Sequence, residues 1–508
     1  MPFNLEPRVS LASAEDFTRV AVLGRLRRAR VDILSIVDMR AAAVALAVVA
    51  AACAKRRDGP EAACPLTYVY DLPEFWDEPF PFAAVADQSE DAIFGPKCAT
   101  AGMRDTQQYA MPTIALWRLL RGGRCRSTAN ASAAALFLVP LWPRPKNQQE
   151  WAAACAADAN LDLAARLPHL TRENAHRHVI LIGKGQVNPA DKCDAWWRSP
   201  RGLVKKFQRV AYSANHAPPG AARGGPPPTL PGSAEPWDYG PAVLTDATLA
   251  KSFTPNPLDD EAPYPHLVSA PYPSSVHARV GGDRPWARSG PRPTLASFAA
   301  GLNHGRYASQ RRRLRDDCLR AGDDCAFADM DAFVASKARA RKKAVAVAGA
   351  LGLDAADHFT DTMRLVEGTQ RDVCDYLAEE KQSAVFCLEP GGDSPYRKSI
   401  YDSVLSGCIP VVFSQYARAV APHHWGSFRN ASTVFVDEAA YAAGDLDLFA
   451  VLRSIPDDAV AAMQRTIDAH AHRLMYALDD YPHDAVENIL VGAAHLARRR
   501  EKRRPPAR

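Results

Sequence analysis

The chain has 508 residues, of which 47% are hydrophobic and 23% are charged, and its formal net charge is +5. This composition is ordinary for a globular protein, and the length is too great for one hydrophobic core, so we expect two α/β domains and a leader. Much of the modest positive charge lies in tails such as residues 498–508, which argues against a nucleic-acid partner. A basic tail is solvated in most proteins, and contact with acidic polysaccharide or lipid headgroups is the alternative.

The amino-terminal part of the chain has the features of a targeting segment. A charge-free apolar run at 41–54 has the length of a signal-peptide core and is shorter than the ~20 residues of a membrane span. We therefore expect residues 1–57 to be an N-terminal extension with a signal peptide or a short signal anchor, and an anchor would attach the protein to a membrane. An Ala-rich helix of a cytosolic domain is the alternative.

The chain has 11 cysteines, and ten would remain after cleavage because Cys53 lies in the leader. An even number suits an oxidising lumen. Cys318 and Cys325 are close enough in the sequence to form a disulfide if a turn joins them. We expect Cys387 and Cys408 to be small buried apolar side chains.

Strand-like runs alternate with helical runs along the chain, which predicts parallel sheets. The stretch 218–293 is rich in Pro, Gly and Asp, and we expect a loop that leads into an interdomain linker. The expected helices are 112–121, 151–165, 310–320, 331–351 and 457–478.

The most informative stretch, 384–413, has the pattern of a strand, a loop, a helix and a second strand. A buried strand at 384–388 is followed by a loop with Gly391 and Gly392. Ser394 before a proline predicts the helix start, and Gly407 predicts its end. The apolar run 409–413 is the second strand, so the stretch forms a βαβ unit.

The loop and helix start of this unit predict a nucleotide diphosphate site. Backbone N–H groups at a helix N-terminus favour a phosphate, and Arg397 and Lys398 add positive charge. Ser399, Asp402 and Ser406 share one helix face at spacings of three and four residues, where Asp402 could accept hydrogen bonds from a ribose. The alternative is an ordinary capped helix with a solvated face.

The stretch 386–414 resembles the signature of the exostosin-like glycosyltransferases, and within them the plant xyloglucan galactosyltransferase branch. A Cys-Leu strand, a Gly-Asp-Ser loop, basic residues, Tyr-Asp-Ser and Gly-Cys-Ile-Pro-Val follow in the order of that branch. Other segments resemble the family's strands and turns in the same order: 68–73, 137–141, 178–183, 270–273 and 292–298.

The resemblance implies an α/β fold of GT-B type, in which two Rossmann-like domains face each other across a cleft. The expected parts are an acceptor-side domain at 65–290 with a Pro/Gly-rich insertion, a nucleotide-sugar-binding domain at 291–480, and a C-terminal helix and basic tail at 481–508. The residues expected to bind the nucleotide sugar are Gly391, Gly392, Asp393, Ser394, Arg397, Lys398, Ser399 and Asp402.

The resemblance also implies transfer of a sugar, with galactose as the leading candidate, from a UDP-sugar to a polysaccharide or glycoprotein glycan. Inversion is expected, without metal or cofactor, and it needs a general base. Asp71, at the end of the first expected strand, is the candidate for that base, with a turn-forming role as the alternative. Asp329, Met330 and Asp331 form an Asp-X-Asp triplet that is expected to precede a basic helix rather than to end a strand, and we expect a helix cap there rather than a metal site.

The expected location is the Golgi or another lumen of the secretory pathway, where sequons at Asn130 and Asn430 would accept glycans. The resemblance implies that His423, His424 and Trp425 contact the donor base. The alternative function is a non-catalytic lumenal partner that keeps the fold and stabilises another transferase. A sulfotransferase would need Lys and Ser/Thr directly after the first strand, where this chain has Asp71.

Overall fold

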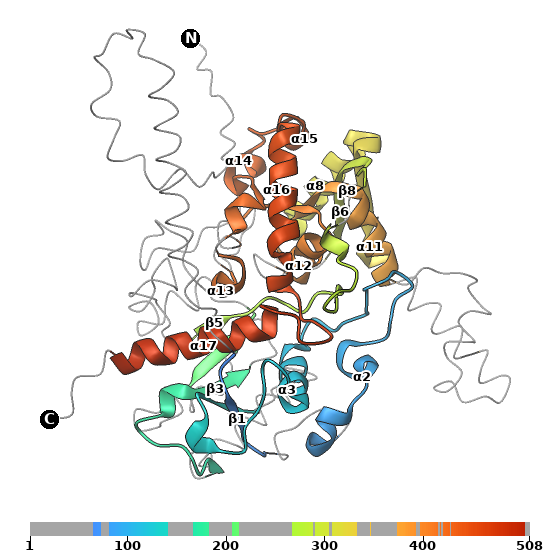
Figure 1. The fold of residues 1–508 in the computed structure, drawn as a ribbon. Helices are drawn as coiled ribbons and strands as arrows, with labels where there is room; N and C mark the ends of the chain where they lie inside the picture. The colour runs from blue at the N-terminus through green and yellow to red at the C-terminus, as the bar shows by residue number, and fades with distance from the viewer. Residues whose placement is uncertain are drawn as a thin grey trace, which may run out of the picture.

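The computed structural model describes part of the chain, and its fold is drawn in Figure 1. The described residues are 64–72, 81–140, 166–181, 206–212, 267–287, 290–303, 307–332, 346, 373–392, 397–414, 417, 420–426 and 428–502. The apolar run 41–54 and the expected helix 151–165 lie outside them, as does most of the expected helix 331–351. Among the described helices, none is long and apolar enough to cross a membrane.

The described residues form two parallel five-stranded sheets, one in the lower half and one in the upper half of Figure 1. The predicted α/β architecture of GT-B type is thereby confirmed. The first sheet has the order β1-β2-β3-β4-β5, with strands Thr67–Val69, Leu136–Val139, His178–Leu181, Gln208–Ala211 and Leu267–Ser269. The second has the order β10-β9-β8-β6-β7, and β6 to β10 are Thr294–Ala300, Cys325–Asp329, Ala384–Glu389, Ile409–Val412 and Val434–Phe435.

Helices and 3-10 turns connect the strands. The α-helices are α2 (Glu90–Phe94), α3 (Met111–Arg121), α8 (Ala308–Ala321), α11 (Val373–Ser383), α12 (Lys398–Leu405), α13 (Pro422–Trp425), α14 (Glu438–Ala443), α15 (Leu448–Arg453), α16 (Asp457–His470) and α17 (Ala485–Lys502). The 3-10 turns are η2 (Phe82–Asp87), η3 (Ala131–Ala133), η5 (Ala175–Arg177), η7 (Pro285–Ala287), η8 (Gly322–Asp324), η10 (Arg429–Ala431) and η11 (Ala471–Leu474).

Several sequence expectations are corrected by these elements. The expected helices 112–121 and 310–320 are present as α3 and α8, but the stretch 218–293 contains β5 and η7 and is therefore not all loop. A three-residue buried strand is too short to show a period in the sequence. The expected helix 457–478 ends earlier, at His470, and is followed by η11. Beyond η11 the chain lies against the segment after β5, where the Tyr476 hydroxyl donates to Pro271 O at 2.7 Å.

Disulfides join three described pairs of cysteines. Cys318 and Cys325, which are close enough in the sequence to pair if a turn joins them, are bonded across η8. Cys387 and Cys408 are buried but also bonded, so the expectation of two plain apolar side chains is wrong. The adjacent strands β8 and β9 bring these two residues together, which their separation in the sequence does not show. The third bond joins Cys64 and Cys125.

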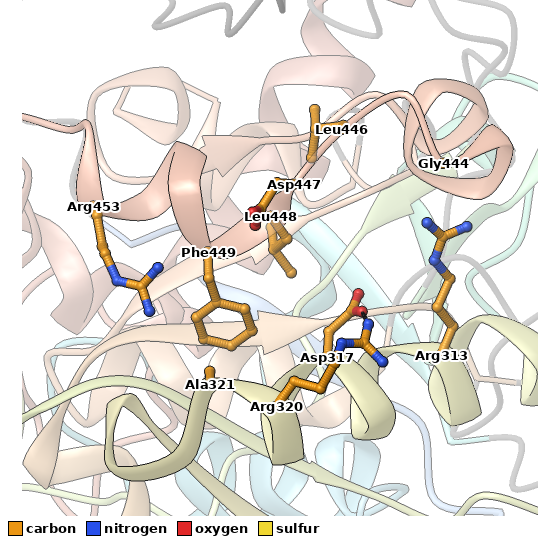
Figure 2. A pocket seen from close by; sticks show the side chains of 10 residues that line it. All are labelled: Arg313, Asp317, Arg320, Ala321, Gly444, Leu446, Asp447, Leu448, Phe449 and Arg453. Atoms are coloured by element: carbon orange, nitrogen blue, oxygen red, sulfur yellow. Dashed lines mark hydrogen bonds and ion pairs between the residues drawn. The ribbon is translucent and has the colours of Figure 1, made fainter.

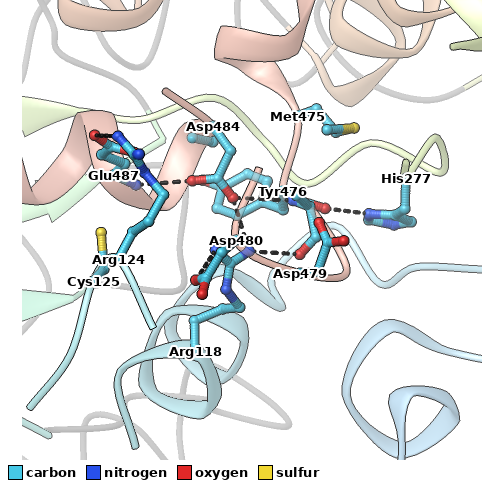
Figure 3. Close-up of polar contacts among 12 residues, drawn as sticks. Arg118, Arg124, Cys125, His277, Met475, Tyr476, Asp479, Asp480, Asp484 and Glu487 are labelled. Atoms are coloured by element: carbon cyan, nitrogen blue, oxygen red, sulfur yellow. Dashed lines mark hydrogen bonds and ion pairs between the residues drawn. The ribbon is translucent and has the colours of Figure 1, made fainter. Parts of the chain in front are cut away.

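A buried ion pair joins the C-terminal part of the chain to α3 (Figure 3). Arg118 donates to Asp484 Oδ2 at 3.1 Å and to Ala477 O at 2.9 Å, and the Asp484 side chain is 0% exposed. Burial raises the pKa of Asp484, although Arg118 acts to lower it. From this junction α17 continues against α3, β2 and β5, so the end of the chain packs on the first sheet.

Replacing Arg118 with Met tests this junction. The change leaves the buried Asp484 carboxylate without its cation, and we expect the free energy of unfolding to fall by about 3–5 kcal/mol in chemical denaturation at pH 8. The loss should shrink at pH 5, because protonation removes the unpaired charge. The control is Arg315→Met, at an exposed pair with Asp316, where a loss above about 1 kcal/mol is not expected. Equal losses in the two variants would contradict the prediction.

Glu438 gives the fold a pH dependence of its own. It lies in the first turn of α14, and burial, with a smaller effect of Asp437, raises its pKa to about 7. The pKa of Glu438 in the folded chain lies above the ordinary value of 4.5. The stability that protonated Glu438 contributes is therefore fully present below pH 4.5 and is lost as the pH rises toward 7. We expect the melting temperature of Glu438→Gln, relative to the native chain, to rise between pH 4.5 and 7. A constant difference across that range would contradict this assignment.

Candidate functional site

The second sheet reverses its strand order between β6 and β8. The chain passes from β6 to β7 on one side and then returns to β8 on the other side of β6. In open parallel sheets, ligands bind beyond the carboxyl ends of the strands at such a reversal. The loop with Gly391 and Gly392 follows β8 directly and therefore lies at this position.

The first loop glycine allows a close contact across the reversal. A Cβ atom on Gly391 would overlap with the ring of Tyr307, which precedes α8, so only glycine fits against that ring. Asp331, which follows β7, accepts hydrogen bonds through its carboxylate from Leu302 N at 2.8 Å and Asn303 N at 2.9 Å. These bonds fix the loop after β6. The loops that follow β6 and β8 are thus held by packing and by hydrogen bonds.

The Asp-X-Asp triplet lies next to this position. Asp329 is the last residue of β7, so the expectation that the triplet does not end a strand is wrong. Its Oδ1 accepts from Asp331 N at 2.9 Å and from Ala332 N at 3.2 Å, which is the expected helix cap. That no metal is needed stays a prediction.

The helix after the loop begins later than the sequence indicated. Helix α12 starts at Lys398, and Arg397 is its N-cap residue in an extended conformation, so the predicted start at Ser394 is wrong. Asp393 and Ser394 lie outside the described residues. The first free N–H groups of α12 therefore belong to residues from Lys398 onward. Gly407, with φ of 72°, follows the end of the helix as predicted.

A buried carboxylate that the sequence analysis did not single out organises this end of β8. Glu389, 1% exposed, accepts from Lys381 Nζ at 2.8 Å and from Arg397 Nη2 at 3.0 Å. Its Oε1 also accepts from the hydroxyl groups of Ser399 at 2.8 Å and Ser403 at 2.5 Å. Burial raises the pKa of Glu389, but the two cations and these hydrogen bonds hold it below its usual range. An acidic residue at the end of an apolar strand was the available sequence signal.

Arg397 is held against the glycine loop by this carboxylate. Its Cδ would lie 3.2 Å from a Cβ atom on Gly392, and its Nη2 is 3.5 Å from Ala299 O at the end of β6. Within the described residues its buried Nε has no hydrogen-bond partner. One end of the guanidinium is therefore fixed, while another donor remains for a ligand at the loop.

Asp402 and Lys398 connect the second sheet to the first. The two side chains form an ion pair at 2.9 Å, and Asp402 Oδ1 accepts from Ser275 N at 2.9 Å. Lys398 Nζ also donates to Ser275 Oγ at 2.7 Å, and Ser275 lies in the segment after β5. Burial raises the pKa of Asp402, but Lys398, Lys381 and the Ser275 N–H hold it below its usual range.

The predicted site residues do not all come together. Ser399 bonds to Glu389 while Asp402 bonds to Ser275, so the two side chains face different partners although they share a helix. Asp71 is exposed directly after β1, the edge strand opposite β5. The structure therefore places Asp71 away from Ser275 and Asp402.

The histidines after β9 pack against the C-terminal helix. His424 Nε2 lies 3.2 Å from Ala485 O, and the ring of His423 lies 3.2 Å from where a Cβ atom on Gly492 would be. Burial lowers the pKa of His423 to about 4 and that of His424 to about 3, so both are neutral near pH 7. Trp425 donates to Ser432 Oγ at 3.1 Å. These contacts are with α17 and with the residue that follows η10 rather than with the glycine loop.

Residues 256–440, which include β5 to β10, match the model of the Exostosin GT47 domain. The resemblance to the exostosin-like glycosyltransferases is confirmed. Among similar Arabidopsis thaliana proteins, the probable xyloglucan galactosyltransferase GT15 is 35% identical over 99 residues, which are 19% of this chain and 20% of that protein. Xyloglucan galactosyltransferase MUR3 is 37% identical over 98 residues, 19% of this chain and 16% of its own length.

The xyloglucan-specific galacturonosyltransferase 1 of the same plant is 30% identical over 154 residues, 30% of this chain and 18% of that protein. The chain thus spans about a fifth of the length of the curated relatives that it matches. Among solved structures, the glycotransferase of kitacinnamycin has a TM-score of 0.25 and 10% identity, with 79% of this chain and 85% of that chain covered.

Replacing Glu389 with Gln tests the buried network. The variant leaves Lys381, 4% exposed, without its counter-charge, so we expect the free energy of unfolding to fall by about 3–5 kcal/mol. The double variant Lys381→Met with Glu389→Gln should recover part of that loss, since it removes both buried charges. Chemical denaturation of the single and double variants measures this coupling. Strictly additive losses would show that the two side chains act independently.

Proposed function

We propose that this chain is a glycosyltransferase that moves a sugar, with galactose as the leading donor sugar, from a UDP-sugar to a polysaccharide or glycoprotein glycan. The observation that carries the proposal is the glycine loop at the strand reversal, with Arg397 held beside it by buried Glu389. The Exostosin GT47 match covers this site, and the similar Arabidopsis thaliana proteins are named as xyloglucan glycosyltransferases.

In this reaction the acceptor hydroxyl oxygen forms a bond to the anomeric carbon of the donor. The bond from that carbon to the diphosphate oxygen breaks, and UDP leaves with the electron pair. Arg397 and the N-terminus of α12 stabilise the negative charge that develops on the diphosphate. With that charge compensated by the protein, we propose inverting transfer that needs neither metal nor cofactor.

Asp402 and Lys398 are proposed to bind the donor after an exchange of partners. Both side chains are bound to Ser275, which belongs to a segment after the first sheet. A small separation of this segment from α12 would free Asp402 Oδ1 for a ribose hydroxyl and Lys398 for a phosphate oxygen. Donor binding would then be coupled to the relative position of the two sheets.

Asp71 remains the residue proposed as general base, which would take the proton from the acceptor hydroxyl. It is an exposed carboxylate at the carboxyl end of β1, where ligands of parallel sheets bind. Its side of the first sheet is the one remote from Ser275, so this role requires an acceptor that extends across the sheet. Asp71→Asn, which keeps the turn-forming ability of the side chain, separates the two roles.

A secretory location is proposed on independent grounds. The described residues contain three complete disulfides, which persist in oxidising compartments. Asn130 and Asn430 are both exposed, as glycan acceptors must be. We propose the Golgi or another secretory lumen, with the apolar run 41–54 as signal peptide or anchor.

One observation favours a second candidate function. The Asp402 carboxylate is fully engaged by Lys398 and Ser275, which would suit a lumenal partner protein that keeps the fold and binds no donor. Direct donor binding separates this candidate from the enzyme, since a partner protein would not bind UDP.

The purified chain should be tested with a panel of UDP-sugars and a mixed pool of glycan acceptors, in the presence of a chelator. We expect transfer from one donor, with UDP-galactose first, and a loss of at least about 100-fold in Asp402→Ala, because the ribose contact and the Lys398 pair disappear together. The matched control is Asp458→Ala, at an exposed carboxylate of α16. A folded chain that neither binds UDP nor transfers any sugar would overturn the enzyme and favour the partner protein.

A further inference from the structure

A hollow lies on the flank of the second sheet, between α8 and the segment that contains α14 and α15 (Figure 2). It is a cavity of about 340 Å³, which is within the range of small-ligand pockets. Its lining residues are Arg313, Asp317, Arg320, Ala321, Gly444, Leu446, Asp447, Leu448, Phe449 and Arg453.

This hollow is separate from the glycine loop. Helix α8 begins after the carboxyl end of β6 and ends at Ala321, just before η8 and the amino end of β7. Arg320 and Ala321 therefore lie toward the amino end of β7, whereas Gly391 and Gly392 follow the carboxyl end of β8. Because the strands are parallel, these two positions are at opposite ends of the sheet.

Three guanidinium groups surround the hollow, and each is held by a different neighbour. Arg313 donates to Ala442 O at 2.9 Å and lies over the ring of Tyr441, 4.7 Å from its centroid. Arg320 pairs with Asp317 on the same helix. Arg453 donates to Asp324 through Nε at 3.0 Å and Nη2 at 2.6 Å. Among the described residues these contacts use only some of the five N–H donors of each guanidinium, so donors remain for a ligand.

The two carboxylates of the lining are already engaged. Asp317 accepts from Arg320 and from the Tyr441 hydroxyl at 2.5 Å. Asp447 is the N-cap residue of α15 and accepts from Ala450 N at 3.0 Å. The lining has three cations and two anions, and Asp324, outside the lining, pairs with the third cation, Arg453. The remaining N–H donors of the three guanidinium groups outnumber the acceptors that the lining leaves free. This balance favours a ligand with an oxyanion, for which the planar guanidinium is well shaped.

The size and the rest of the lining favour a sugar that carries this oxyanion. Leu446, Leu448 and Phe449 form an apolar part of the lining, against which the C–H groups of a sugar ring can pack. A cavity of about 340 Å³ is larger than a bare phosphate or sulfate needs. Figure 2 shows Arg313 and Arg320 on α8, with Phe449 and Arg453 reaching toward them from α15.

We propose that this hollow binds an acidic saccharide, with the carboxylate of a uronic acid on the guanidinium groups and the ring against the apolar lining. The site would hold a segment of polysaccharide away from the site of sugar transfer. It goes beyond the proposed function and does not require turnover, since binding can be measured with or without a donor.

The test is a calorimetric or NMR titration of the full chain with a trigalacturonate probe. We expect binding that weakens at least about tenfold in the double variant Arg320→Ser with Arg453→Ser, because two charge-assisted contacts are lost. Both side chains are at least half exposed, so folding should be kept. The matched control is Arg315→Ser, on the same helix and outside the lining, which should bind the probe as the native chain does.

Two further probes distinguish the sources of binding. A neutral trisaccharide should bind at least about tenfold more weakly than trigalacturonate, and so should inorganic phosphate. Equal binding of the neutral sugar, equal binding of phosphate, or unchanged affinity in the double variant would each overturn the proposal, as would no binding of trigalacturonate. UDP binding, measured in parallel, should be the same in native chain and double variant, so a failure of the donor site is seen separately.

Discussion

The arrangement of helices on the second sheet, which occupies the upper half of Figure 1, depends on how one buried negative charge is compensated. Glu389 lies at the carboxyl end of β8, where an unpaired carboxylate would be very costly in free energy. Its partners come from three elements: Lys381 from α11, Arg397 before α12, and two serines within α12. Because all of them must reach the same two oxygens, the charge fixes the position of both helices against β8. The position of the glycine loop then follows from the short chain that joins β8 to α12.

Among the described contacts that join the two halves of the molecule, two differ in character. At one, Arg118 and Asp484 form a buried pair that joins α3 to the approach of α17. At the other, Asp402 and Lys398 meet Ser275 through hydrogen bonds that a ligand could replace. We expect the first joint to stay closed, because separating Arg118 from Asp484 would leave a buried charge without its partner. The second is the place where we propose that donor binding is coupled to the relative position of the two sheets.

The two ends of the upper sheet offer different chemistry. The carboxyl ends of β6 and β8 carry a glycine loop, a fixed guanidinium and a helix N-terminus, which suit a diphosphate. The flank near the amino end of β7 carries three guanidinium groups around a hollow with a mostly polar lining and an apolar part, which suits an acidic sugar. A transferase that acts on a polymer would benefit from this separation, since holding the polymer would not compete with binding the donor.

The sequence alone determined the βαβ unit, its glycine loop and the family resemblance, because these depend on residues that are close together in the chain. The same local reasoning located α3, α8 and the end of α12 at Gly407. It missed β5, the role of Glu389 and the bond between Cys387 and Cys408, since each depends on partners from other strands or helices. It also placed the start of α12 too early, where Arg397 is held in an extended conformation by the tertiary contact with Glu389. Only the tertiary structure decided that Asp402 faces Ser275 and that three arginines surround a hollow, because packing brings distant segments of the chain together.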